Sequence, residues 1–83
     1  MEKIYIYNEI LKYFISVTNL ESSEIPRNKS LLEEGYIDSF GIIELIEFIE
    51  KKYNMNIMDD EISTENLGGI EKITDFIFKK LKK

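Results

Sequence analysis

A loop meets an amphipathic helix in the stretch Leu31-Leu32-Glu33-Glu34-Gly35-Tyr36-Ile37-Asp38-Ser39-Phe40. An Asp-Ser pair is a natural start for a helix, because short oxygen-bearing side chains accept hydrogen bonds from the unpaired N–H groups there. The same position leaves the Ser39 hydroxyl exposed at the positive end of the helix dipole, where a phosphodiester would be stabilised. Taken with the rest of the chain, this pattern leads us to interpret Ser39 as the attachment point of a prosthetic group.

On both sides of this stretch, apolar residues recur at helical spacing and predict an all-α fold. Main helices are expected at about 3–18, 39–53 and 70–81, and a short helix capped by Ser63 is expected at about 63–67. No run alternates long enough to predict a strand. Residues 1–83 are therefore expected to form one domain, a small bundle of three main helices plus one short helix.

Each main helix has an apolar stripe that we expect to face the core. The three stripes are Ile4, Tyr7, Ile10, Leu11 and Phe14; Ile42, Leu45, Ile46, Ile49 and Tyr53; and Ile70, Ile73, Ile77 and Leu81. Between the first two helices, Leu31 and Leu32 are expected to pin a long loop to this core. The run Asp59-Asp60-Glu61 is also expected to be loop.

The chain contains neither cysteine nor histidine. It therefore lacks the usual thiolate nucleophile, the usual general base and the usual soft metal ligands. A catalytic site also needs a shaped pocket, for which a small helical domain has little room. We expect a protein that is not an enzyme. No run approaches the roughly 20 apolar residues of a membrane span, and no secretory signal is evident, so we expect a cytoplasmic monomer.

Acidic residues are concentrated in the middle of the chain. Between Leu31 and Asn66 the net charge is −8, whereas the whole chain has a net charge of −5. Such a segment repels the phosphates of nucleic acids and attracts basic partners. The alternative is that these charges form an ordinary solvated face.

The second helix is expected to expose two large apolar residues, Phe40 and Ile43, among the acidic residues Glu44 and Glu47. Apolar side chains rimmed by charge are common at docking sites for other proteins. We therefore predict a partner-binding face here. The alternative is that Phe40 folds back over the loop and is merely packed.

The stretch 31–40, followed by Ile43-Glu44-Leu45-Ile46 and Glu50-Lys51-Lys52-Tyr53, resembles the acyl carrier protein family. Members typically have a glycine shortly before an Asp-Ser-Leu signature, then a helix with an acidic exposed face, an acidic loop, a short helix and a final helix. The resemblance covers nearly the whole chain. It implies that a phosphopantetheinyl transferase moves 4′-phosphopantetheine from coenzyme A to Ser39. The thiol of that group would then hold an acyl or aminoacyl cargo as a thioester.

The resemblance also implies roles for the residues around Ser39. Asp38 would cap the helix and help the metal-bound coenzyme A of the transferase to approach. Phe40 would occupy an apolar dent on partner enzymes, and Ile43, Glu44 and Glu47 would be recognised with it. The implied partners are the transferase, an acyl- or aminoacyl-loading ligase, and a downstream acyltransferase or synthase.

Three positions depart from the carriers of primary fatty-acid synthesis. Phe40 replaces the usual Leu, Gly41 stands where Asp is common, and Glu47 stands where some members have a large apolar residue. These departures favour a specialised pathway, such as polyketide, nonribosomal peptide or aminoacyl transfer.

Two other functions remain open from the sequence. The first is an unmodified helical interaction module that binds a protein partner through the acidic face of the second helix. The second is weak divalent-cation binding at Asp59-Asp60-Glu61, although this run lacks the alternating ligands and the mid-loop glycine of an EF-hand.

Overall fold

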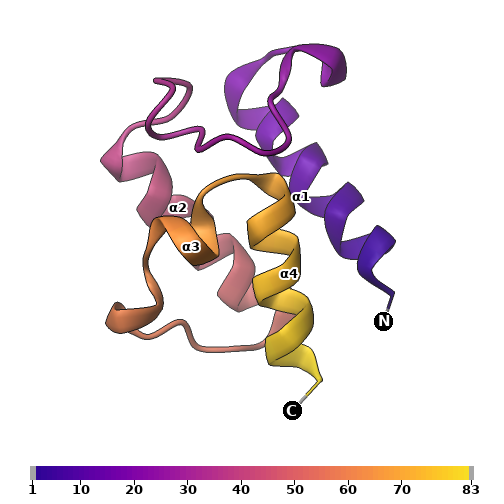
Figure 1. The fold of residues 1–83 in the computed structure, drawn as a ribbon, viewed down its shortest axis with the longest axis vertical. Helices are drawn as coiled ribbons and strands as arrows, with labels where there is room; N and C mark the ends of the chain where they lie inside the picture. The colour runs from indigo at the N-terminus through magenta and orange to yellow at the C-terminus, as the bar shows by residue number, and fades with distance from the viewer. Residues whose placement is uncertain (1, 83) are drawn as a thin grey trace.

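The computed structural model describes residues 2–82, and these residues form a helical bundle (Figure 1). Its helices are α1 (Lys3–Thr18), α2 (Ser39–Tyr53), α3 (Thr64–Leu67) and α4 (Ile70–Leu81). Single 3-10 turns, η1 and η2, occur at Ser22–Glu24 and Asp59–Glu61. Residues 2–82 contain no strand. The predicted architecture of three main helices and one short helix is confirmed.

The prediction of a loop at Asp59-Asp60-Glu61 is wrong in detail, because these residues form the 3-10 turn η2. The Glu61 carboxylate accepts a hydrogen bond of 2.9 Å from the N–H of Met58, which closes the turn. The same carboxylate also contacts Lys80 of α4 at 2.9 Å. The third residue of the acidic run therefore fixes the turn and ties it to α4.

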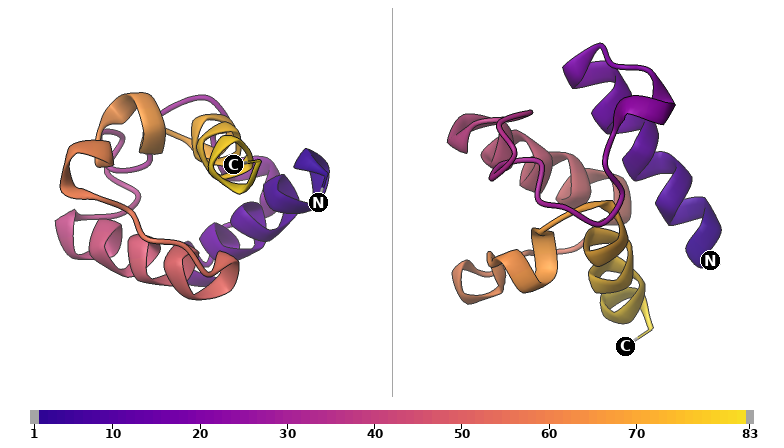
Figure 2. Two further views of the ribbon diagram at one scale, coloured as in Figure 1. Left: turned by 90° about the horizontal axis from the view of Figure 1, so that it is seen from below. Right: turned by 45° about the horizontal axis from the view of Figure 1, so that its top comes forward.

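The helices pack around α4, which contacts both α1 and α3 (Figure 1). The start of α1 and the end of α4 lie at the same end of the molecule, so these two helices run antiparallel. In the view of Figure 1, α2 lies behind α3 and α4. The loop 19–38 passes over the start of α4 (Figure 2). Within residues 2–82, no helix is long and apolar enough to cross a membrane.

The core is almost entirely apolar. It is built from Ile6, Ile10, Phe14, Ile25, Leu31, Leu45, Ile49, Tyr53, Ile57, Leu67, Ile70, Ile73, Phe76 and Ile77. Thr74 is the one buried polar residue among residues 2–82, and its hydroxyl donates to the carbonyl of Ile70 at 2.8 Å. Ile42 and Ile46 are only partly buried against this core.

Two residues of the predicted helical stripes, Ile4 and Leu81, are exposed instead. Ile4 is 55% exposed, and Ile6, which the pattern did not select, is fully buried. Helix α1 has apolar residues on several faces, so its own pattern allows more than one stripe, and packing against the bundle selects the line Ile6, Ile10 and Phe14. Leu81 is 37% exposed because it is the last residue of α4.

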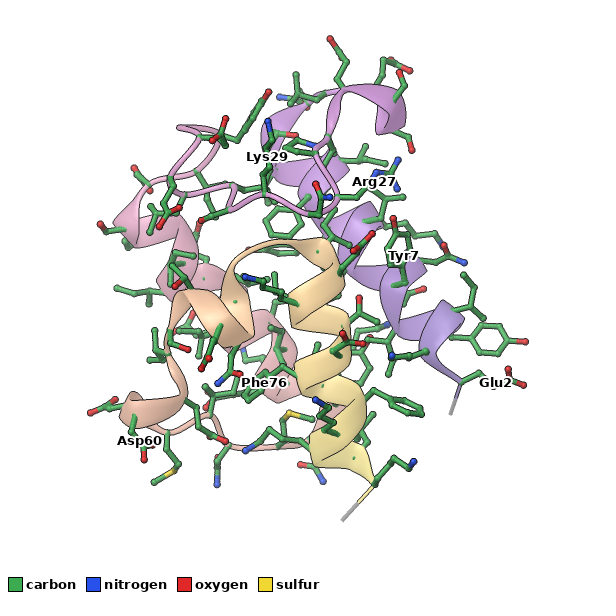
Figure 3. The ribbon with its side chains drawn as sticks, viewed as in Figure 1. Glu2, Tyr7, Arg27, Lys29, Asp60 and Phe76 are labelled. Atoms are coloured by element: carbon green, nitrogen blue, oxygen red, sulfur yellow. The ribbon has the colours of Figure 1, made fainter. Side chains whose placement is uncertain are left out.

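Arg27 fixes the long loop between α1 and α2. Its guanidinium donates to the Tyr7 hydroxyl at 3.1 Å and to the Ser22 carbonyl at 2.8 Å, and it lies over the Tyr7 ring (Figure 3). The Arg27 carbonyl accepts the N–H of Glu71 at the start of α4. Of the two loop leucines predicted to reach the core, Leu31 is buried, whereas the prediction is wrong for Leu32, which is 39% exposed. Arg27 therefore ties the loop to α1 through Tyr7 and to α4 through Glu71.

Candidate prosthetic-group attachment site and docking face

Asp38 caps α2 as the sequence predicts. Its backbone is extended, with φ −106° and ψ −174°, and its Oδ1 accepts the N–H of Gly41 at 2.9 Å. Its carbonyl accepts the N–H of Ile42 at 3.1 Å. Among residues 2–82, the N–H groups of Ser39 and Phe40 then have no partner. These free donors carry the positive partial charge of the helix end.

Ser39 is the first residue of α2, and its side chain is exposed. The carbonyl of Leu31 accepts the N–H groups of Tyr36 and Ile37, at 2.8 and 3.2 Å, and so holds the turn before the helix. Within residues 2–82 the Ser39 hydroxyl makes no hydrogen bond. An open hydroxyl on the first residue of a helix fits a phosphodiester, because unpaired N–H groups at a helix N-terminus stabilise negative charge.

The next turns of α2 form a mixed face, which we call the docking face: Phe40, Ile43, Glu44 and Glu47. Phe40 is 65% exposed and Ile43 is 54% exposed, so Phe40 does not fold back over the loop. Neither glutamate pairs with a cation among residues 2–82. The face therefore offers two apolar side chains and two uncompensated charges.

Positive charge lies at the opposite end of α2. Lys51 and Lys52 occupy the last turn, where cations complement the helix dipole. Lys52 also pairs with Glu9 of α1 at 3.1 Å. This hydrogen bond and the positive charge of Lys52 lower the pKa of the Glu9 carboxyl. The acidic residues of α2, Glu44, Glu47 and Glu50, therefore lie between Ser39 and these two lysines.

No group of three acidic side chains within residues 2–82 is arranged to hold a metal ion. Asp60 projects outward from its turn (Figure 3), and the Glu61 carboxylate is engaged by Lys80. The described residues provide no support for the cation-binding alternative.

Two clefts beside the first two turns of α2 were not evident from the sequence. One of about 220 Å³ lies between α1, the end of the loop and the start of α2. We call it the aromatic–acidic cleft, and it is lined by Tyr13, Val17, Tyr36, Ile37, Asp38, Gly41 and Glu44. The other, of about 190 Å³, lies between α2 and α3 and is lined by Ser30, Leu32, Ile42, Ile62, Ser63, Thr64 and Leu67. The only sequence signal for the first was Tyr36, an aromatic residue shortly before the Asp-Ser pair.

Comparison with characterised proteins identifies relatives along almost the whole chain. The acyl carrier protein of Buchnera aphidicola subsp. Schizaphis graminum (strain Sg) is 32% identical, over 94% of this chain and 96% of that protein. The acyl carrier protein of Porphyromonas gingivalis (strain ATCC 33277) is 29% identical, over 93% of this chain and 96% of that protein. The meromycolate extension acyl carrier protein of Mycobacterium leprae (strain TN) is 34% identical, over 74% of this chain and 49% of that protein.

A family model described as the phosphopantetheine attachment site matches residues 8–77. That range spans α1 to the last turns of α4 and includes the Asp38-Ser39 pair. Proteins of this family are carriers rather than enzymes, and they work with phosphopantetheinyl transferases and synthase enzymes. The match along the chain, the helical bundle and the relatives agree: the chain belongs to the acyl carrier protein family and carries covalently attached 4′-phosphopantetheine.

Proposed function

We propose that Ser39 is the residue that carries 4′-phosphopantetheine, and that the docking face presents the loaded arm to partner enzymes. The observation that supports this most directly is the exposed Ser39 hydroxyl, which has no hydrogen bond within residues 2–82 and lies beside the free N–H groups of the α2 start. The hydroxyls of Ser16, Ser22, Ser30 and Ser63, in contrast, take part in hydrogen bonds to the chain. Ser23 is exposed like Ser39, but it lies in the 3-10 turn η1 and not at the start of an α-helix.

In the proposed transfer, the Ser39 oxygen forms a bond to the pantetheine phosphorus of coenzyme A. The phosphoanhydride bond breaks, and adenosine 3′,5′-bisphosphate leaves. No group within residues 2–82 is placed to accept the proton of the hydroxyl, since Ser39 has no hydrogen-bond partner there. The transferase must therefore supply the base, and this chain contributes an unhindered nucleophile and a positive helix end.

The attached group brings the thiol that this sequence lacks. A chain with no cysteine holds its cargo through the arm alone, so an acyl or aminoacyl thioester cannot migrate to a thiol of the carrier itself. The lack of histidine likewise leaves no imidazole on the chain to promote hydrolysis of that thioester. We expect a loading ligase to form the thioester and a downstream acyltransferase or synthase to consume it.

We further propose a specialised biosynthetic pathway in the cytoplasm, with the protein acting as a monomer and a single domain. Phe40, Gly41 and Glu47 are the positions that favour this over primary fatty-acid synthesis. By its name, the Mycobacterium leprae relative serves meromycolate extension, so at least one relative of this chain has a dedicated product.

Weak contacts spread over the docking face suit a shuttle, because exposed ion pairs contribute only about 0–1 kcal/mol each and permit fast release.

The test is to incubate the full chain with coenzyme A and a broad-specificity phosphopantetheinyl transferase and to measure intact mass. One phosphopantetheine adduct is expected, and Ser39→Ala should abolish it. Ser30→Ala and Ser63→Ala are controls that should retain the adduct. An unmodified wild-type chain would overturn the assignment and favour an unmodified interaction module, and an adduct that persists in Ser39→Ala would move the attachment to another residue.

A further inference from the structure

The lysines of the chain bear on the stability of the cargo, because a thioester reacts with amines as well as with thiols. The chain has no cysteine and no histidine, which leaves amines, chiefly the Nζ atoms of lysines, as its strong nucleophiles. No lysine occurs between residues 30 and 50, the stretch that contains Ser39. A lysine that reacts with the cargo must therefore be brought near Ser39 by the fold.

Most lysines are engaged by other groups or lie at the other end of the bundle. Lys51 and Lys79 are in the last turns of α2 and α4, far along the bundle from the start of α2 (Figure 1). A further set contacts an acidic side chain or an aromatic ring: Lys3, Lys12, Lys52, Lys80 and Lys82. Within residues 2–82, this leaves Lys29 of the loop and Lys72 in the first turn of α4.

Lys29 combines a fixed backbone with a free side chain. It lies on the loop that leads to α2 (Figure 3), and its carbonyl oxygen is so close to Gly69 that a Cβ there would approach it to 2.8 Å. Its side chain is exposed, and among residues 2–82 its Nζ makes no ion pair or hydrogen bond. The amine is therefore free to move about a fixed point of attachment.

The cleft between α2 and α3 connects the surroundings of Lys29 with those of Ser39. It is lined by Ser30, the residue after Lys29, and by Ile42, which lies about one turn after Ser39. Its volume is only about 190 Å³, so these two lining residues face each other across a short gap. An arm attached to Ser39 is longer than this gap, and it can bring its thioester to the Lys29 side chain.

Lys72 is less well placed for the same reaction. Its neighbour Glu71 lines a separate cleft between α1 and α4. No residue of α4 lines the cleft between α2 and α3. Lys29 is consequently the lysine that best fits an arm starting at Ser39.

We propose that Lys29 is a site of self-acylation, which accepts small acyl or aminoacyl groups from the thioester on the arm. The unprotonated Nζ forms a bond to the thioester carbonyl carbon, the carbon–sulfur bond breaks, the sulfur leaves as a thiolate, and the nitrogen gives up one proton to the solvent. The products are an amide on Lys29 and a free arm that can be loaded again. The proposal rests on the proposed function, because it needs a thioester tethered at Ser39.

Tethering is what favours this transfer over reaction with amines in solution. A short flexible link gives an effective concentration on the order of millimolar without any further contact. Hydroxyls also line the cleft, from Ser30, Ser63 and Thr64. The chain has no imidazole to activate them, so the amine is the favoured acceptor.

The experiment loads the full chain with an acetylated arm, using acetyl-coenzyme A and a broad-specificity phosphopantetheinyl transferase, and then removes both. After incubation at pH 9, neutral hydroxylamine cleaves the remaining thioester and leaves amides intact. Intact mass should show an acetyl group that resists hydroxylamine, and peptide mass spectrometry should place it on Lys29. The resistant fraction should be larger at pH 9 than at pH 7, because only the unprotonated amine reacts. It should not depend on protein concentration, because the transfer occurs within one chain.

Lys29→Arg keeps the positive charge and should lower the resistant fraction at least fivefold. Lys72→Arg and Lys51→Arg are matched controls that should leave it unchanged, because both lysines are exposed and make no ion pair among residues 2–82. A Ser39→Ala chain mixed with the loaded chain should stay unacetylated. Equal losses in Lys29→Arg and Lys72→Arg would overturn the proposal, as would acetylation of the Ser39→Ala chain as fast as that of the loaded chain.

The carrier assignment and the Lys29 proposal fail in different ways in this experiment. A chain that gains no phosphopantetheine before hydroxylamine would overturn the carrier assignment and the Lys29 proposal together. A chain that gains the group and then loses all of its acetyl to hydroxylamine would overturn the Lys29 proposal alone.

Discussion

The N–H of Gly41 donates a hydrogen bond of 2.9 Å to Oδ1 of Asp38, and this contact defines where α2 begins. Asp38→Ala should lower the free energy of unfolding by about 1 kcal/mol, because the loss of an N-cap side chain typically has that effect. Asp38→Asn should retain most of the stability, since its amide oxygen still accepts the bond. Urea denaturation monitored by far-ultraviolet circular dichroism measures both variants.

Asp60→Ala is the control for the Asp38 variants, because Asp60 is exposed and makes no side-chain cap. It should change the free energy of unfolding by less than about 0.5 kcal/mol, as most surface substitutions do. If Asp38→Asn lost as much stability as Asp38→Ala, the charge of the carboxylate rather than its hydrogen bond would hold the helix start.

Charge reversal of the docking face should slow partner enzymes without unfolding the chain. Glu44→Lys combined with Glu47→Lys removes two unpaired negative charges and adds two positive ones, so the steering of a basic partner is lost. We expect transfer of phosphopantetheine at low salt to slow by about tenfold or more, which is within the range of electrostatic steering. The difference should shrink as salt screens the charges.

The matched control for this reversal is Glu65→Lys combined with Glu71→Lys. These exposed acids lie on α3 and α4, and the pair changes the net charge by the same amount. If both double variants slowed transfer equally, net charge alone would explain the effect. If neither did so at low salt, the docking face would have no electrostatic role.

The loop 19–38 depends on close contact with the glycine before α4. Gly69 has a φ of +133°, and a Cβ there would lie 2.8 Å from the carbonyl oxygen of Lys29. Gly69→Ala should therefore lower the free energy of unfolding by about 2–4 kcal/mol, from backbone strain and the clash together. Gly35 has a φ of +84° with nothing within 4 Å of such a Cβ, so Gly35→Ala should cost only about 1–2 kcal/mol.

Equilibrium denaturation of Gly69→Ala and Gly35→Ala separates backbone strain from the clash with the loop. Both glycines have a positive φ, but only a Cβ at Gly69 would meet Lys29. Equal losses would show that Lys29 moves aside freely. In that case the contact between the loop and the start of α4 would not position the residues that lead to Asp38.

The main helices could be predicted from the sequence because their signals are local. Ser63 and Asp38 cap the helices that follow them, and Asn54 ends α2 in a left-handed conformation with φ 52°. The buried face of α1 could not be predicted, since Ile4 and Ile6 are both apolar and only contact with the bundle distinguishes them. Those parts of the site that depend on contacts between helices could not be predicted for the same reason.

Ser39, Asp38 and the docking face lie within ten residues of sequence, so their order along one helix was enough to place them together. The aromatic–acidic cleft combines Tyr13 of α1 with Tyr36 of the loop and Glu44 of α2. The existence of this cleft depends on how α1 packs alongside α2. No periodicity within a single segment contains that information.

Tyr53 at the end of α2 carries a polar atom that the core does not satisfy. The residue is only 8% exposed, and its hydroxyl has no hydrogen-bond partner among residues 2–82. A buried unsatisfied hydroxyl costs about 1–3 kcal/mol, so Tyr53→Phe should raise the free energy of unfolding by about 1 kcal/mol. Tyr5→Phe is the control, because Tyr5 is 62% exposed and should show no change.

The same substitution should alter the stability of the protein at alkaline pH. Burial, and to a lesser extent the charge of Glu9, raise the pKa of Tyr53 above its usual 10.0. Above about pH 10 the unfolded chain therefore binds fewer protons than the folded one, and the free energy of unfolding falls as the pH rises toward the folded pKa. Tyr53→Phe should flatten this fall, measured by urea denaturation between pH 8 and pH 11, whereas Tyr5→Phe should not. If Tyr53→Phe destabilised the protein at neutral pH, the hydroxyl would have a partner such as a buried water, and its removal would break a bond rather than relieve a cost.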